Sequence, residues 1–275
     1  MTPGRPARWA VVALACGVVA ACGTTAKATS HISTPTTVAW PSSPVPRGSS
    51  PAPAGKAAAP AAGYIPSAAT LVLKAEDDAL SQGWAHIDVT TSGGGHYAVY
   101  SQDSGPAVGH QTFTVDGAQA EAIVVGGVVY ARGDAAAVTT IFGLPASEEW
   151  HLANQWISFS GDDAGYSGIS SGVTLRSALG QLTLGGALQV GAPTVVDGVP
   201  AVPITGTVTS AGGSAPGTGT LYITPGSGTL PVELDVRGAD GTTSRVRYSH
   251  WGVPAQLSAP AAAIPASSVA PSASG

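Results

Sequence analysis

The chain has 275 residues, of which 10% are charged, and its formal net charge is -5 at pH 7. An acidic chain with few, scattered basic residues is a poor nucleic-acid binder, so we expect no nucleic-acid partner. The two cysteines are Cys16 and Cys22, so everything after Cys22 lacks a disulfide framework and a cysteine-based metal site.

The N-terminal residues have the pattern of a lipoprotein signal peptide, which we predict over 1–21. Arg5 and Arg8 precede an apolar run that is too short to span a bilayer, and this run ends in Val19-Ala20-Ala21-Cys22. Small residues directly before a cysteine resemble the lipobox of bacterial lipoproteins. The resemblance implies that Cys22 is acylated and becomes the first residue of the mature chain.

Two alternatives remain for this region. Cys22 is an incidental thiol after an ordinary signal peptide, or Cys16 is the acceptor, although Ala13 stands where the lipobox prefers a larger aliphatic residue. No apolar run after the signal is long enough for a transmembrane helix. We therefore expect an N-terminal acyl anchor to be the membrane attachment, at the extracytoplasmic face of the cell membrane.

Ala, Pro, Ser and Thr dominate the next segment, which carries no sustained apolar period. Such a composition predicts that residues 22–66 form the lipidated cysteine and a disordered tether. A binding tract for a proline-recognising partner is the alternative interpretation.

A helix is predicted to begin after the N-cap Ser67 and to end at Gly83, because its apolar residues recur at helical spacing. Leu73 and Leu80 form a second, narrower apolar pair beside the main stripe. We expect this pair to line one wall of a ligand cavity, with Trp84 at its mouth. Packing of both leucines against residues 173–184 is the alternative.

Short strands are predicted after the helix, and Gly-rich turns separate them. They form an antiparallel meander with strands at 85–90, 97–100, 113–115, 120–125 and 128–131. The middle of the chain predicts helices at 135–142, 147–154 and 173–184, with a short strand near 156–159. Strands resume at 193–196, 200–208, 218–223, 230–236 and 243–251, with Asp-Gly turns at two junctions. We place one folded domain at 67–257 and a disordered tail at 258–275.

Three segments carry a resemblance to a known group: 124–133, 154–157 and the pair 231–234 with 248–252. They resemble LolA-like lipoproteins of actinobacterial cell envelopes, the LppX/LprG-type group. The resemblance implies an α+β fold, in which an unclosed antiparallel β-barrel, or half-barrel, is covered by a few helices. It also implies an apolar cavity for acyl chains in the members that carry lipids, and no shared catalytic residues.

Candidate catalytic and metal sites are weak in this sequence. Gly168-Ile169-Ser170-Ser171-Gly172 matches G-x-S-x-G, but a loop precedes it where a nucleophile elbow needs a strand. The histidines have no recognised metal spacing. Glu148-Glu149 is typical of a helix first turn, and Asp162-Asp163 of a loop. We therefore expect no enzyme, no catalytic or metal-binding residue and no cofactor.

Two hypotheses for function follow. The first is a membrane-anchored extracytoplasmic lipoprotein that binds or carries a lipid or another apolar ligand in the cell envelope. The second is a non-enzymatic interaction or sensor-associated module with a filled core that docks another envelope protein. An apolar cavity of several hundred Å³ favours the first hypothesis, and a packed interior favours the second.

Overall fold

The structure, a computed structural model, describes residues 66–163, 165–180, 184–208 and 217–269. These residues form a 13-stranded sheet in the order β13-β6-β5-β4-β3-β2-β1-β12-β11-β10-β9-β7, and β8 pairs with β9 beside this path. The outermost strands β13 and β7 do not pair with each other, so the sheet is not closed. This confirms the predicted unclosed antiparallel half-barrel with a few helices.

The first half of the sheet is the predicted meander, in which each strand pairs antiparallel with the next. Its strands are β1 (Ala85–Gly93), β2 (His96–Ser104), β3 (Gly109–Val115), β4 (Ala118–Val125), β5 (Val128–Gly133) and β6 (Ile157–Phe159). Side chains alternate between a buried and an open face along these strands, as the period of two requires.

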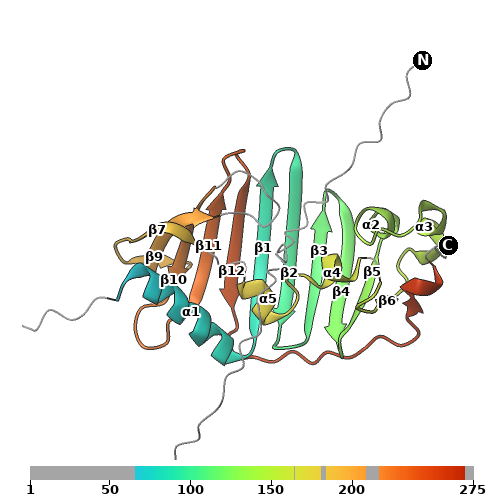
Figure 1. Ribbon diagram of the computed structural model, residues 1–275, viewed down its shortest axis with the longest axis horizontal. Coiled ribbons are helices and arrows are strands. Elements are labelled where there is room, and N and C mark those ends of the chain that lie inside the picture. The colour runs from blue at the N-terminus through green and yellow to red at the C-terminus, as the bar shows by residue number, and fades with distance from the viewer. Residues whose placement is uncertain (1–65, 164, 181–183, 209–216, 270–275) are drawn as a thin grey trace, which may run out of the picture. The chain divides into compact units, whose positions relative to one another are not determined.

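The second half contains β7 (Gly185–Val190), β8 (Thr194–Val196), β9 (Val199–Val208), β10 (Gly217–Ile223), β11 (Pro231–Arg237) and β12 (Thr243–Ser249). Strand β12 returns beside β1 and pairs with it antiparallel, with Asp88 opposite Arg247. Strands β1 and β12 thus join the two halves into one sheet (Figure 1).

The helices lie on one face of the sheet (Figure 1). They are α1 (Ala68–Gln82), α2 (Ala135–Thr140), η1 (Ala146–Glu148), α3 (Glu149–Leu152), α4 (Tyr166–Ser170), α5 (Leu175–Leu179) and η2 (Ala266–Ser268). The bounds predicted for α1 are confirmed. The Ser67 side chain accepts a hydrogen bond from the Thr70 N–H, and Gly83 ends the helix in the left-handed conformation, with φ at 77°.

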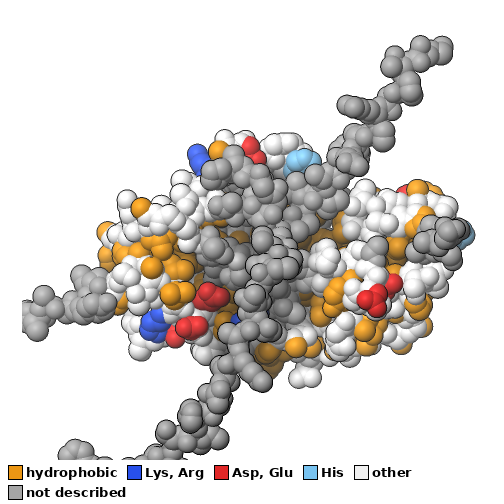
Figure 2. Space-filling view, viewed as in Figure 1, with side chains coloured by type: hydrophobic (Ala, Val, Ile, Leu, Met, Phe, Trp, Pro, Cys, Tyr) orange, Lys and Arg blue, Asp and Glu red, His pale blue; other side chains and the backbone are white. Residues whose placement is uncertain are grey.

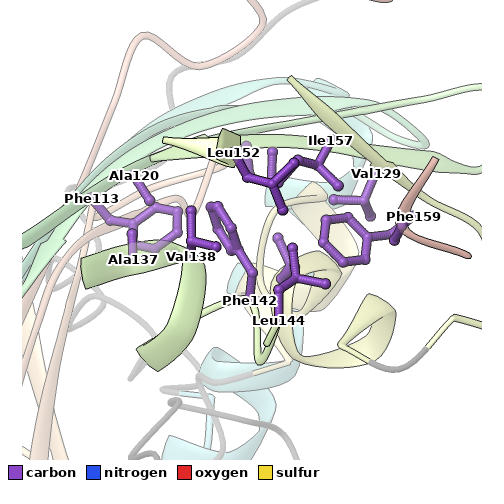
Figure 3. Packing of buried hydrophobic residues seen from close by; sticks show 14 of the residues in the cluster. Phe113, Ala120, Val129, Ala137, Val138, Phe142, Leu144, Leu152, Ile157 and Phe159 are labelled. Atoms are coloured by element: carbon purple, nitrogen blue, oxygen red, sulfur yellow. The ribbon is translucent and has the colours of Figure 1, made fainter. Parts of the chain in front are cut away.

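The core between the helices and the sheet consists of two apolar clusters. The first joins β3 to β6 with α2, α3 and α4, and the aromatic rings of Phe142 and Phe159 meet edge to face within it (Figure 3). The second joins α1 and α5 to β1 and β9 to β12. Ala75 and Ala79, both fully buried, present methyl groups from α1 to this cluster, so the helix can lie close to its neighbours.

Polar side chains are buried on the helix-bearing side of β2 and β3. The Gln111 side-chain amide donates to Oε1 of Gln102, and Nε2 of Gln102 donates to the Gly172 backbone carbonyl at 2.9 Å. The Ser104 hydroxyl donates to the Val173 carbonyl at 2.9 Å. The segment leading into α5 is therefore fixed to the sheet by buried hydrogen bonds, which are costly to leave unmade.

The structure differs from the sequence prediction in the middle of the chain. Of the helix predicted at 173–184, only α5 forms, and a second short helix, α4, precedes it. Residues 181–183 lie outside the described residues. Strand β7 was not predicted, because Gly185 and Gly186 are poor strand formers and only pairing with β9 places them in the sheet.

The predicted disordered tail is wrong for residues 258–269, and the domain extends past residue 257. The tail runs back to β6, where β13 (Ile264–Pro265) pairs with it in parallel. The Ile264 N–H donates to the Trp156 carbonyl at 2.8 Å, and Ala266 is buried in the first cluster. The open edge of β6 supplies these acceptors, which explains why a Pro- and Ala-rich segment becomes ordered there.

Candidate functional site

Leu73 and Leu80, predicted to line a ligand cavity, are seven residues apart in α1 and lie on the same face of the helix. Leu80 packs against the second apolar cluster, whereas Leu73 is 63% exposed. That the two leucines line one wall of a cavity stays a prediction. Cys22, the predicted lipidation site, lies outside the described residues, as does the tether up to residue 65.

Trp84 is half-buried where the chain leaves α1 and enters β1. A Cβ on Gly105 would stand 2.8 Å from its indole ring, so the ring lies flat against the backbone at the end of β2. The Trp84 carbonyl also accepts from the Gly252 N–H at 2.9 Å. These contacts hold Trp84 between Gly105 and Gly252, next to the helix that bears Leu80.

Two phenols lie on the helix-bearing face of the sheet, and sequence reasoning did not single them out. Tyr248, on β12, is 6% exposed and stacks on Trp251 with ring centroids 6.0 Å apart. Tyr100, on β2, stacks on Phe113 at 5.7 Å and contacts both apolar clusters. Burial raises the pKa of both hydroxyls, so both stay neutral at physiological pH. Within the part of the chain that the structure describes, neither hydroxyl has a hydrogen-bond partner.

The opposite face of the sheet is polar and carries pairs of histidine and carboxylate on neighbouring strands. His86 contacts Asp103 at 2.8 Å, and His110 contacts Glu121 at 2.9 Å. The backbone alternation that buries the apolar residues on one face places these residues on the other. The sequence predicted that His86 and Asp88 share a face, and their side chains are 3.4 Å apart.

The side chains of Ser101, His86 and Asp103 form a chain of contacts in the order of the Ser-His-Asp triad of serine hydrolases. The Ser101 hydroxyl is 3.4 Å from His86 Nε2, and His86 Nδ1 is 2.8 Å from Asp103. A relay also needs backbone N–H groups directed at the developing oxyanion. Ser101 lies in the middle of β2, between two paired strands, where the ladder uses the backbone N–H groups. The arrangement is therefore a surface hydrogen-bond chain without an oxyanion hole.

The weak catalytic and cation candidates have structural roles. Ser170 is the last residue of α4, so it does not stand on a turn between a strand and a helix, as a nucleophile elbow requires. Asp163 accepts from the Ser160 N–H and hydroxyl, both at 2.7 Å, which lowers its pKa and closes a turn. Over the described residues, no cluster of three or more His, Cys, Asp or Glu side chains is suited to hold a metal ion.

Hydrophobic side chains gather at the end of the helix-bearing face that β7, β9 and α1 form (Figure 2). Leu73 and Val190 are the exposed large hydrophobic residues of α1 and β7. In the described part of the chain, no helix has the length and hydropathy to cross a membrane.

Comparison with known proteins gives matches in structure alone. No family model matches the sequence, and no curated protein matches it. The fold is similar to that of the lipoprotein LppX from Mycobacterium tuberculosis, with 16% identity and a TM-score of 0.47, over 70% of this chain and 98% of that chain. LprF from Mycobacterium bovis matches with 15% identity and a TM-score of 0.47, over 70% and 96%. An uncharacterized conserved protein from Thermus thermophilus matches with 12% identity and a TM-score of 0.40, over 72% and 98%.

Proposed function

We propose that this chain is an extracytoplasmic lipoprotein, acylated at Cys22, whose folded body binds a lipid or another apolar ligand without covalent chemistry. The signal pattern, the Pro- and Ala-rich tether and the sequence resemblance to LolA-like envelope lipoproteins support the anchor and the location. The main support for binding of an apolar ligand is the pair of phenols, Tyr248 and Tyr100, on the apolar helix-bearing face of the sheet.

A buried hydroxyl without an acceptor costs roughly 1–3 kcal/mol. An ester or carboxyl oxygen of a bound lipid would accept from the Tyr248 hydroxyl and remove this cost. A phenol is protonated at physiological pH at its ordinary pKa, and burial raises the pKa of Tyr248 further, so its hydroxyl is a donor. The aliphatic side chains of the second cluster, which includes Ile87, would then cover the hydrocarbon.

Helix α5 is the element that a ligand would displace. It has five residues, and its Leu175 and Leu179 side chains fill the second cluster. An acyl chain entering here would replace these two side chains. Its gain of about 0.8 kcal/mol for each buried CH₂ group must then exceed the roughly 1.5–3 kcal/mol that each displaced leucine loses. Leu80 borders the same cluster, whereas Trp84 lies against Gly105 and Leu73 is exposed.

The test is titration of the delipidated protein with a fluorescent fatty acid. Tyr248→Phe removes the hydroxyl and keeps the ring, and we expect it to weaken binding about tenfold, as the loss of one buried hydrogen bond implies. Tyr97→Phe is the matched control, because Tyr97 is 53% exposed. If the delipidated wild-type protein takes up no acyl probe, the ligand-binding proposal fails.

The interaction module remains the second candidate, and two observations favour it. Leu175 and Leu179 fill the second cluster, as a module with a filled core requires. Trp150, on α3, is 82% exposed, and tryptophan often anchors protein interfaces. Loss of an envelope-protein partner on Trp150→Ala, together with an absence of acyl binding, would favour this candidate over the first.

A further inference from the structure

The polar face of the sheet is hollowed beside an overhanging hairpin. Strands β8 and β9 meet at the turn Asp197-Gly198, where both residues have positive φ, at 48° and 83°. The Asp197 carboxylate pairs with Arg247 on β12 at 3.1 Å. Because β10 and β11 lie between β9 and β12, the hairpin tip must cross both strands to make this contact.

Two hollows lie on this face, with volumes of about 710 and 520 Å³. The larger one follows β10, β11, β12 and β1, and the smaller one lies under the hairpin. Both are lined by Asp235, Arg245 and Arg247, so the two hollows adjoin, and we call them together the polar groove.

The charges in the polar groove compensate one another. Arg245 pairs with Asp235 at 2.9 Å, and Arg247 pairs with Glu233 at 3.1 Å. Glu233 is only 5% exposed, and both Arg245 and Arg247 pair with its carboxylate and hold it in place. The carboxylates that line the groove are Asp88, Asp197, Glu233 and Asp235, and the guanidinium groups are Arg237, Arg245 and Arg247. A surface so nearly neutral attracts neither polyanions nor polycations strongly.

Hydroxyl groups cover the rest of the groove floor. Thr90 and Ser92 project from β1, and Thr218 and Thr220 project from β10. Tyr222 adds an aromatic ring below the hairpin. The floor strands are paired on both sides, so a peptide cannot join the sheet there by adding a strand. The polar floor likewise gives an acyl chain little to pack against.

We infer that the polar groove binds a neutral, hydroxyl-rich chain, namely an uncharged oligosaccharide. Sugar hydroxyls both donate and accept, so they match a floor of threonine hydroxyls, carboxylates and guanidinium groups. The ion pairs hold Arg245, Arg247 and Asp235 in fixed orientations, which lowers the entropy lost when a ligand binds. This site lies on the opposite face of the sheet from Tyr248 and does not depend on the proposed acyl ligand.

Calorimetric titration of the full chain with oligosaccharides tests this inference. The neutral probes are maltoheptaose, a mannan oligosaccharide and an arabinan oligosaccharide, and the comparison probes are heparin fragments and a Ser/Thr-rich dodecapeptide. We expect a neutral probe to bind, with an affinity that changes little between about 50 and 500 mM NaCl, because no net charge is neutralised. If no neutral probe binds at millimolar concentration, or only heparin or the peptide does, the inference is overturned.

Matched variants locate the binding. Thr90→Val and Thr220→Val remove hydroxyls from the floor and keep the side-chain shape, and we expect each to weaken binding about fivefold or more. Thr112→Val, on the same face but outside the groove, should leave binding unchanged. Unaltered binding in both groove variants would place the sugar elsewhere and refute the assignment. The fatty-acid titration on the same variants should stay unchanged, which separates this inference from the acyl proposal.

Discussion

The carbonyl oxygen of Val173 lies directly against the Cα of Gly109, so that a methyl group on Gly109 would stand 2.2 Å from this oxygen. Real Cβ atoms essentially never approach another atom so closely. The contact brings the segment before α5 onto β3, and the Ser104 hydroxyl donates to the same carbonyl. A glycine at this position is thus what lets the helical segment rest on the sheet.

We predict that Gly109→Ala destabilises the protein by about 1–3 kcal/mol, because the segment must move away from the sheet or strain both backbones. Urea denaturation followed by circular dichroism measures the change. Gly161→Ala is the control, since a Cβ at Gly161 meets nothing within 4 Å. Equal stability of the two variants would mean that the segment before α5 moves away from β3 without a loss of stability.

Much of the fold could be predicted from local sequence. The N-cap Ser67 and the terminal Gly83 delimit α1, and Gly126-Gly127 joins β4 to β5, because these signals act over a few residues. Strands β7 and β13 could not be predicted in this way. Strand β7 forms because it pairs with β9, and β13 forms because it pairs with β6. Neither partner is the neighbouring strand in sequence.

The candidate site was harder to predict than the fold. Periodicity selected Leu73 and Leu80 alike, and only the packing of α1 shows that Leu80 is covered while Leu73, on the same helical face, is exposed. Tyr248 and Tyr100 gave no local signal. Their positions matter because β12 closes beside β1, and this pairing joins residues more than 150 positions apart.

The stability of the α1 region should depend on the ionisation of Asp78. Its carboxylate pairs with Lys74 and accepts from the Thr229 N–H at 2.7 Å, and these contacts lower its pKa from the ordinary value of 3.8. The ionised form therefore stabilises the fold above pH 3.8, and this contribution is lost as the pH falls through the lower folded pKa.

We expect Asp78→Asn to lower the melting temperature at pH 7, with a difference from wild type that shrinks as the pH falls below about 4. Thermal melts from pH 7 to pH 2 test this. Asp77→Asn serves as the control, because Asp77 is exposed on the same helix. A difference that persists unchanged at pH 2 would show that ionisation of Asp78 is not responsible.

Truncation after Leu257 should destabilise the first apolar cluster. The shortened chain loses β13 and Ala266, which is 4% exposed, and it uncovers the edge of β6. We expect a loss of about 1–3 kcal/mol relative to a chain that ends at residue 269. Brief proteolysis of the full chain should likewise remove residues before about 66 and spare those up to about 269. Early cleavage between 258 and 263, with no change in the melt, would contradict this expectation.

The last prediction concerns the anchor. Cys22→Ala removes the thiol that we propose is acylated, so the protein should leave the membrane fraction for the medium or remain as an unprocessed precursor. Cys16→Ala is a matched control, because we expect Cys16 to be removed with the signal peptide and to have no role in the mature chain.

Cell fractionation gives the distribution of each variant, and intact mass of the membrane-bound form shows whether an acyl group is present. Stable membrane anchoring takes more than one acyl chain, because a single chain binds membranes only marginally. Complete loss of the modification should therefore move most of the protein out of the membrane fraction. Membrane association that survives Cys22→Ala but not Cys16→Ala would move the lipidation site to Cys16, and association that survives both would exclude a thiol-linked anchor.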